Sequence, residues 1–235
     1  MRPVLFQHGG VTIRSYPVML YVGIVAGIAA GNAAARAAGI DALRVTAATL
    51  ILLVPALAGA RLFYAATHWG FYRGAPDRIW DRKRGGAAQY GGLLLALPLS
   101  VPIAGALHLD WGGYWDAAVF SILTAMIFGR TGCLLQGCCA GRLSRSRFAF
   151  HGRLPTQYLE AGWAACLLVL AIVIRPRLPF SGALFWAVAG GYAAGRLGLE
   201  STREEGAGTF TIHHGLSAAL VLLSLAEFSF RWPHH

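Results

Sequence analysis

The sequence predicts an all-α integral membrane protein, with about seven transmembrane helices around a lipid-accessible cavity and short basic loops between them. Two observations are compositional: 56% of the 235 residues are hydrophobic and only 13% are charged, whereas soluble domains carry about 25% charged residues. Mean hydropathy is +0.55. The third observation is that the apolar residues fall into stretches of about 20, the length of helix that crosses a bilayer core.

Seven such stretches follow one another along the chain, and each predicts one transmembrane helix. They occupy residues 17–38, 42–66, 90–107, 117–138, 158–174, 180–199 and 210–228. Because they leave no room for a separate soluble unit, we expect residues 1–235 to form a single transmembrane domain.

The first stretch is expected to remain in the protein rather than to act as a cleavable signal peptide. Residues 7–10 and Arg14 interrupt the segment before it, and the apolar run that follows is long enough to span. Gly23, Gly27 and Gly31 recur at every fourth position of this run. Small residues at this spacing predict a face on which a neighbouring helix packs closely.

The formal net charge is +10, and Lys83 is the only lysine among the 20 basic residues. Guanidinium groups donate two parallel hydrogen bonds to phosphate, so anionic phospholipids are the expected partners. Nucleic acid is not expected, because the arginines lie in short loops between spans. Positive charge beside a span also sets membrane orientation, and this alternative explains any single loop arginine equally well. Taken alone, the distribution of charge favours a cytoplasmic N-terminus.

Arg130 lies within the fourth apolar stretch, where an ionisable side chain is costly and marks a functional site by default. Cys133, Cys138 and Cys139 follow it, around a helix break expected at Gly137. A catalytic or redox thiol and simple packing both remain open for these cysteines. A zinc site with the histidines at 213 and 214 matches no established spacing, so we expect neither a metal nor another cofactor.

Four segments, taken in order, resemble the prolipoprotein diacylglyceryl transferase family over nearly the whole chain. Residues 129–142 are similar to the two ends of its signature, Gly-Arg-x-Gly and Gly-Arg, and residues 89–93 resemble a family stretch ending in His-Gly-Gly-Leu. Residues 155–160 look like the family's His-Pro-Ser-Gln-Leu-Tyr-Glu. Residues 192–204 resemble its Tyr-x-x-x-Arg-x-x-x-Glu-x-x-Arg-Glu.

This resemblance implies an enzyme that transfers the diacylglyceryl group of phosphatidylglycerol to the cysteine thiol of a preprolipoprotein lipobox. The products are a thioether and glycerol 1-phosphate. It also implies a multi-pass protein of the bacterial inner membrane with an extracytoplasmic N-terminus, whereas the distribution of basic residues favours a cytoplasmic one. A transporter is disfavoured, since no inverted repeat stands out.

The resemblance also implies the site. Arg130 and Arg196 fall on family arginines, and two guanidinium groups in a low-dielectric cavity would stabilise the phosphate leaving group. We therefore expect them to converge between the fourth and sixth helices. Tyr90 and Cys138 complete the expected catalytic set. The expected substrate-binding residues are Gly91, Gly92, Cys133, Cys139, Arg142, Tyr192, Glu200, Arg203 and His214.

Departures from the family keep a second function open. Tyr90 stands where the family has histidine, Cys133 replaces an asparagine and Cys138 replaces a glutamate, so the expected base is missing. An unperturbed tyrosine has a pKa of about 10 and is a weak base. His214 could replace the base or only satisfy a helix end. The alternative to transfer is a membrane protein that binds an anionic lipid, with a redox or metal role for the cysteines. Glu200 with Arg203 could also form only a local ion pair.

Overall fold

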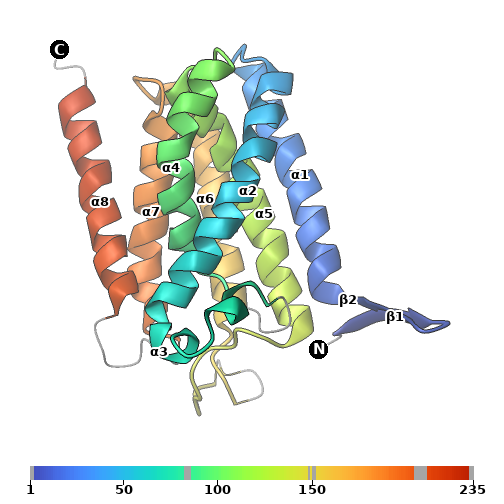
Figure 1. The fold of residues 1–235 in the computed structure, drawn as a ribbon. Helices are drawn as coiled ribbons and strands as arrows, with labels where there is room; N and C mark the ends of the chain where they lie inside the picture. The colour runs from blue at the N-terminus through green and yellow to red at the C-terminus, as the bar shows by residue number, and fades with distance from the viewer. Residues whose placement is uncertain (1–2, 82–85, 148, 150–151, 204–210, 233–235) are drawn as a thin grey trace.

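The protein is a bundle of long helices preceded by a small β-hairpin (Figure 1). The structure is a computed structural model that describes residues 3–81, 86–147, 149, 152–203 and 211–232. The long helices are α1 (Ser15–Ala37), α2 (Ala42–Thr67), α4 (Gln89–Ala106), α5 (Trp111–Gln136), α6 (Thr156–Ile174), α7 (Ala183–Glu200) and α8 (Ile212–Arg231). The short elements are β1 (Val4–His8), β2 (Val11–Arg14), α3 (Trp69–Tyr72) and the 3₁₀ helices η1 (Pro76–Trp80) and η3 (Arg175–Arg177).

Within the described residues, six helices are long and apolar enough to cross a membrane, so the predicted all-α integral membrane class is confirmed. The predicted count of seven spans is not. The exception is α7, which fills the predicted sixth position but does not reach the hydropathy of a span. Its glycines and the charged Arg196 and Glu200 lower its hydropathy. These same charged residues belong to the site described below.

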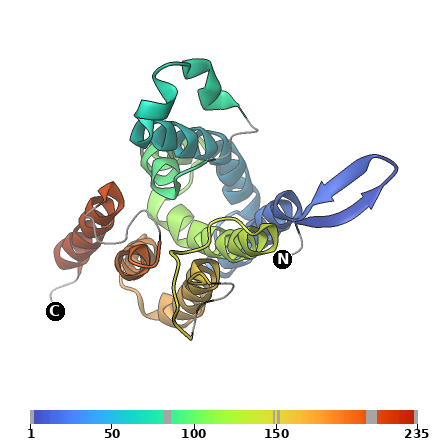
Figure 2. The same ribbon diagram turned by 90° about the horizontal axis from the view of Figure 1, so that it is seen from below.

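The hairpin of β1 and β2 is not predicted from the sequence, and neither are the short helices α3, η1 and η3. The two strands pair antiparallel and project from the bundle (Figures 1 and 2). Gly9 and Gly10 connect them with φ angles of 54° and 84°. Two successive left-handed residues form the tight turn that suits the twist of a hairpin, and glycine adopts this conformation without a steric penalty.

Helix α1 packs along α5 through the glycine face predicted from the sequence. A Cβ atom on Gly27 would lie 2.6 Å from the carbonyl oxygen of Ser121, and one on Gly23 would lie 3.0 Å from the Cβ of Phe128. Any side chain at these positions would therefore push the two helices apart. This close contact fixes α5, the helix that carries Arg130.

Arg61 positions the start of α4. Its guanidinium group donates to the carbonyl oxygens of Gly86 at 2.7 Å and Asp81 at 3.4 Å, in the connection that follows α2. Residues 82–85 of this predicted basic loop lie outside the described residues. The bonds of Arg61 satisfy loop carbonyl groups that no helix or strand pairs, and they hold Gln89 and Tyr90 at the beginning of α4.

The beginning of α7 is fixed by a carboxylate on α5. Asp116 accepts hydrogen bonds from the backbone N–H groups of Gly182 at 2.8 Å and Phe185 at 2.9 Å. These groups lie at the start of a helix, where backbone N–H groups lack partners within the helix and the helix dipole favours a negative charge. These bonds fix the axial position of α7 relative to α5. That position also places Arg196 and Glu200, which lie at the other end of α7.

Candidate functional site

Five helix ends meet at one end of the bundle and assemble the candidate site. They are the first turns of α4, α6 and α8 and the last turns of α5 and α7 (Figures 1 and 2). The segment between α5 and α6 closes over this end, because Arg142 donates its backbone N–H to the carbonyl oxygen of Thr202 at 2.9 Å. Residues far apart in the sequence are thus brought together.

Glu160 is the centre of the site. Its carboxylate is 3% exposed, and three guanidinium groups converge on it from other segments. Arg130 on α5 places Nε 2.7 Å from Oε2. Arg203, after α7, places Nη1 3.0 Å from Oε1, and Arg196 on α7 donates to the same oxygen. The expected convergence of Arg130 and Arg196 is confirmed as geometry, although the group they share is a carboxylate.

A second carboxylate and an amide complete the network. Glu200 places Oε2 3.0 Å from Nη2 of Arg196, close enough for an ion pair but without hydrogen-bond geometry. Gln89, the first residue of α4, accepts at Oε1 from Arg130 Nη2 at 3.1 Å and from the Tyr192 hydroxyl at 2.7 Å. The three arginines and two glutamates carry a net charge of +1, so the cluster favours one further anion.

Glu160 and Gln89 are functional candidates that the sequence reading left out of the site, although both lie in segments that resemble the family. The signal for Glu160 was available, because a glutamate inside the apolar stretch 158–174 is as costly as Arg130 and needs a cationic partner. The proposed local pair of Glu200 with Arg203 does not form: Glu200 pairs with Arg196, four residues before it on α7, and Arg203 pairs with Glu160 on α6. Residue 204 of the same segment lies outside the described residues.

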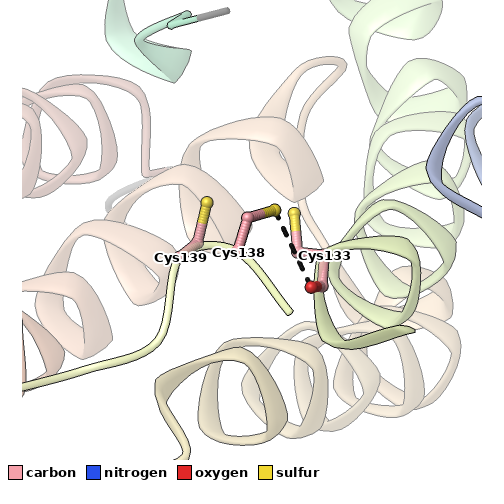
Figure 3. Close-up of side chains that lie close together, drawn as sticks. All are labelled: Cys133, Cys138 and Cys139. Atoms are coloured by element: carbon pink, nitrogen blue, oxygen red, sulfur yellow. Dashed lines mark hydrogen bonds between the residues drawn. The ribbon is translucent and has the colours of Figure 1, made fainter. Parts of the chain in front are cut away.

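The three neighbouring cysteines form a cluster beside the ion network, where α5 ends at Gly137 as predicted. Their sulfur atoms all lie within 4.8 Å of one another. Figure 3 shows the sulfur atoms of Cys133 and Cys138 facing one another, with that of Cys139 on the same side. Cys133 is buried, whereas Cys138 and Cys139 are exposed, and all three are free thiols.

Neighbouring groups set the acidity of the two exposed thiols. A hydrogen bond with the Cys133 thiol, assisted by the charges of Arg130 and Arg203, lowers the pKa of Cys139 to about 6. Burial raises the pKa of the Cys138 thiol. Thiolate, the nucleophilic and metal-binding form, is therefore favoured at Cys139.

Tyr90 lies apart from these cysteines in the bundle interior. Its hydroxyl hydrogen-bonds Ser217 on α8, and its ring stacks on His213 with the ring centroids 6.0 Å apart. His214 caps α8 instead, where its Nδ1 accepts from the backbone N–H of Thr211 at 3.2 Å. The helix-end role foreseen for His214 is therefore observed, and the histidine beside Tyr90 is its neighbour.

Gly91, Gly92 and Arg142 have structural contacts in addition to the binding role expected of them. A Cβ atom on Gly91 would lie 2.4 Å from the carbonyl oxygen of Gly59, and one on Gly92 would lie 3.0 Å from that of Ala56. Both glycines therefore allow α4 to approach α2. The Arg142 side chain is exposed, and within the described residues it forms no ion pair. Their contact with substrate stays a prediction.

An open apolar groove lies between α6 and α7, the helices that carry Glu160 and Arg196. It has a volume of about 450 Å³, and its lining includes Tyr158, Gly162, Trp163, Gly195 and Gly198. Gly162 and Gly198 leave open space, since a Cβ atom on either would meet no neighbour within 4 Å. The helices that supply Glu160 and Arg196 thus also border an open apolar groove suited to hydrocarbon.

Fold and site together define a multi-pass membrane protein with a cationic site at one end of its helix bundle and an apolar groove beside it. Sequence comparison identifies its family. A family model described as prolipoprotein diacylglyceryl transferase matches residues 3–230. The chain belongs to this family.

Curated relatives agree with this assignment. The chain is 27% identical to a phosphatidylglycerol–prolipoprotein diacylglyceryl transferase of Dehalococcoides mccartyi, over 95% of this chain and 90% of the relative. Proteins of the same name from Clostridium kluyveri and Bacillus licheniformis are each 24% identical to it. These matches cover 87% and 98% of this chain and 86% and 93% of the respective relatives.

Proposed function

We propose that the protein transfers the diacylglyceryl group of phosphatidylglycerol to the thiol of a lipobox cysteine on a preprolipoprotein. A thioether forms, and glycerol 1-phosphate is released. The observation that carries the proposal is the family match over residues 3–230. The alternative of a lipid-binding protein without transferase activity finds no support in the relatives, whose names all describe the transfer.

The arginine network supplies what a phosphate leaving group needs. In the transfer, the C–O bond between the diacylglyceryl group and the phosphate breaks, and negative charge grows on the departing phosphate. Guanidinium groups fixed in advance stabilise that charge without having to reorganise. Glu160 fixes Arg130 and Arg196 through ion pairs from one buried carboxylate. Within the described part of the chain, Nη1 of Arg130 has no acceptor, so a phosphate oxygen could take this position.

Gln89 and Tyr192 support the orientation of Arg130. Gln89 accepts from both of them through a single oxygen atom, which restricts the plane of the guanidinium group. We propose Tyr192, Glu200 and Arg203 as residues that hold the phosphate site in shape. Cys138 stands where the family has glutamate, and we propose that it faces the acceptor thiol. Tyr90 stands where the family has histidine, and its part in the transfer stays a prediction.

The apolar groove between α6 and α7 is our proposed seat for one acyl chain of the lipid. Gly162 and Gly198 leave it room for hydrocarbon, because a Cβ atom on either would meet no neighbour within 4 Å. We propose that the lipid approaches the ion network from this side, because Gly195 of the groove directly precedes Arg196 on α7.

The substrates place the reaction in the bacterial inner membrane, and we propose that the N-terminus and the site are extracytoplasmic. The hairpin offers a direct test, because Gln7 is exposed. A Gln7→Cys variant should react with a membrane-impermeant maleimide in intact cells, above the wild-type background. Labelling only after the membranes are opened would contradict this orientation.

Complementation tests the activity in cells. In a bacterium whose own prolipoprotein diacylglyceryl transferase is shut off, expression of this protein should restore growth and the lipid modification of lipoproteins. An Arg130→Ala variant, expressed at the same level, should not. Unmodified precursor in cells that contain correctly inserted wild-type protein would argue against the proposed function.

A further inference from the structure

The cysteine cluster has the spacing of a metal site. Zinc binds thiolate sulfur at about 2.3 Å, so sulfur ligands around one tetrahedral zinc lie about 3.8 Å apart. The sulfur atoms of Cys133, Cys138 and Cys139 all lie within 4.8 Å of one another. If the distances between the sulfur atoms shortened by about 1 Å, which side-chain rotation allows, all three atoms would lie at zinc-binding distance.

The backbone is shaped to gather these atoms. Gly137 ends α5 with φ at 77°, and Cys139 also has a left-handed conformation, with φ at 61°. Such a conformation is unusual for a residue other than glycine and indicates a local requirement. Here it returns the third sulfur atom to the side of the other two (Figure 3). Gln157 fixes the same turn by donating to the carbonyl oxygen of Cys138 at 2.7 Å.

Other roles explain the cluster less well. Packing does not account for Cys138 and Cys139, because both are exposed. A disulfide between Cys133 and Cys138 would leave the third thiol without a role. Among the described residues, no histidine or carboxylate joins the three sulfur atoms, so a metal bound here would keep a fourth position free. Three protein ligands with one open position are typical of catalytic zinc, and thiolates select zinc over magnesium or calcium.

We propose that Cys133, Cys138 and Cys139 bind one Zn²⁺ ion, whose open position takes up the acceptor thiol of the lipobox cysteine. The inference rests on the proposed transfer reaction and reverses the expectation that no metal is bound. It answers the question that the missing family base leaves open, since a thiol bound to zinc is deprotonated outright.

The step balances without an oxidant. The acceptor thiol binds zinc and releases its proton to water. Its sulfur then attacks the terminal glycerol carbon of the diacylglyceryl group, forming the C–S bond while the C–O bond to phosphate breaks. The bonding electrons leave with the phosphate as glycerol 1-phosphate, next to Arg130 and Arg196. With the acceptor thiolate bound, zinc and its four thiolates carry a charge of −2, and the positive charges of Arg130 and Arg203 lie nearby.

Metal content gives the first test. Wild-type protein purified in detergent after growth with zinc should contain about one zinc per chain, and a variant with all three cysteines changed to serine should lose at least about nine-tenths of it. Cys166→Ser is the matched control, because Cys166 is an exposed free cysteine on α6, outside the cluster. Wild-type protein without zinc, or zinc retained by the triple variant, would overturn the proposal.

Cobalt gives a second readout that does not depend on turnover. Co²⁺ should replace zinc and show sulfur-to-cobalt charge-transfer absorption, which is absent from the triple variant. A lipobox peptide should change this spectrum, whereas its Cys→Ser counterpart should not. An identical response to both peptides would refute uptake of the acceptor thiol.

The two proposals fail in different ways. Loss of the proposed function would appear as no lipidated peptide from zinc-loaded protein whose cobalt form still responds to the peptide. Loss of the zinc inference would appear as full transfer by the triple cysteine variant, freed of metal, from phosphatidylglycerol.

Discussion

Arg196→Ala should destabilise the protein because it removes the cationic partner of the buried Glu200 carboxylate. Glu160 would keep ion pairs with Arg130 and Arg203, but Glu200 would lose the ion pair that Arg196 provides. The side chains of Arg196 and Glu200 are only 9% and 3% exposed. Removing one partner of a buried ion pair costs about 3–5 kcal/mol, mainly because the other charge stays uncompensated.

A second substitution separates stability from catalysis. Arg196→Ala with Glu200→Gln removes the stranded charge, and the remaining cost should fall to about 1 kcal/mol, the net contribution of an ordinary hydrogen bond. For a chain of this size, each kcal/mol shifts the melting temperature by about 2–4 °C. The single variant should therefore melt about 6–20 °C below wild type, and the double variant only about 2–4 °C below it.

Thermal unfolding in detergent, followed by tryptophan fluorescence, measures these shifts, and the transfer assay is run on the same samples. Both variants should be inactive, because neither has the guanidinium group that faces the phosphate. Equal melting temperatures for the two variants would show that Glu200 is not stranded by the loss of Arg196. Transfer activity that returns in the double variant would show that Arg196 is not part of the phosphate site.

Three further predictions concern the phosphate site, the groove and the thiols. Arg130→Lys should lower kcat/KM about 100-fold or more in vesicles of phosphatidylglycerol, because one ammonium group cannot contact both acceptors of the guanidinium group; activity near wild type would contradict the bidentate role. Gly198→Leu should fill the groove and reduce transfer from long-chain more than short-chain lipid, whereas Gly105→Leu, at another open and exposed glycine, should reduce neither; equal losses for both chain lengths would rule out the groove as an acyl site. In metal-free membranes at pH 7, a water-soluble maleimide should react faster with Cys139 than with Cys133, because Cys139 is exposed and its pKa is lowered to about 6; preferential labelling of Cys133, measured by peptide mass spectrometry, would contradict this order.

Hydropathy predicts the long helices because each segment that crosses lipid must be apolar by itself, and its own sequence therefore reveals it. The cost of a charge in hydrocarbon marks Arg130 and Glu160 alike, but of these two the predicted site contains only Arg130 and lacks the carboxylate that organises the arginines. The end of the helix at Gly137 could also be predicted from the local sequence, since glycine adopts a left-handed conformation without a penalty.

Features that depend on partners distant in the sequence could not be read from the chain. Gln89 connects α4 with two other helices through Arg130 and Tyr192, and nothing in its immediate sequence announces this. Tyr90 stacks on His213 rather than on His214 because the register of α8 decides which of two adjacent histidines faces the bundle. The hairpin escaped notice because its strands are short and exposed, so no buried face imposes a pattern.

The most direct test of the central claim is to quantify both products of one reaction with purified protein. Labelled phosphatidylglycerol in vesicles and a lipobox peptide are the substrates, and mass spectrometry measures the lipidated peptide together with glycerol 1-phosphate. The account predicts that the two products form in equal amounts, that a peptide with serine in place of cysteine gives neither, and that Arg130→Ala abolishes both. Folded wild-type protein that binds phosphatidylglycerol but yields no thioether would contradict it.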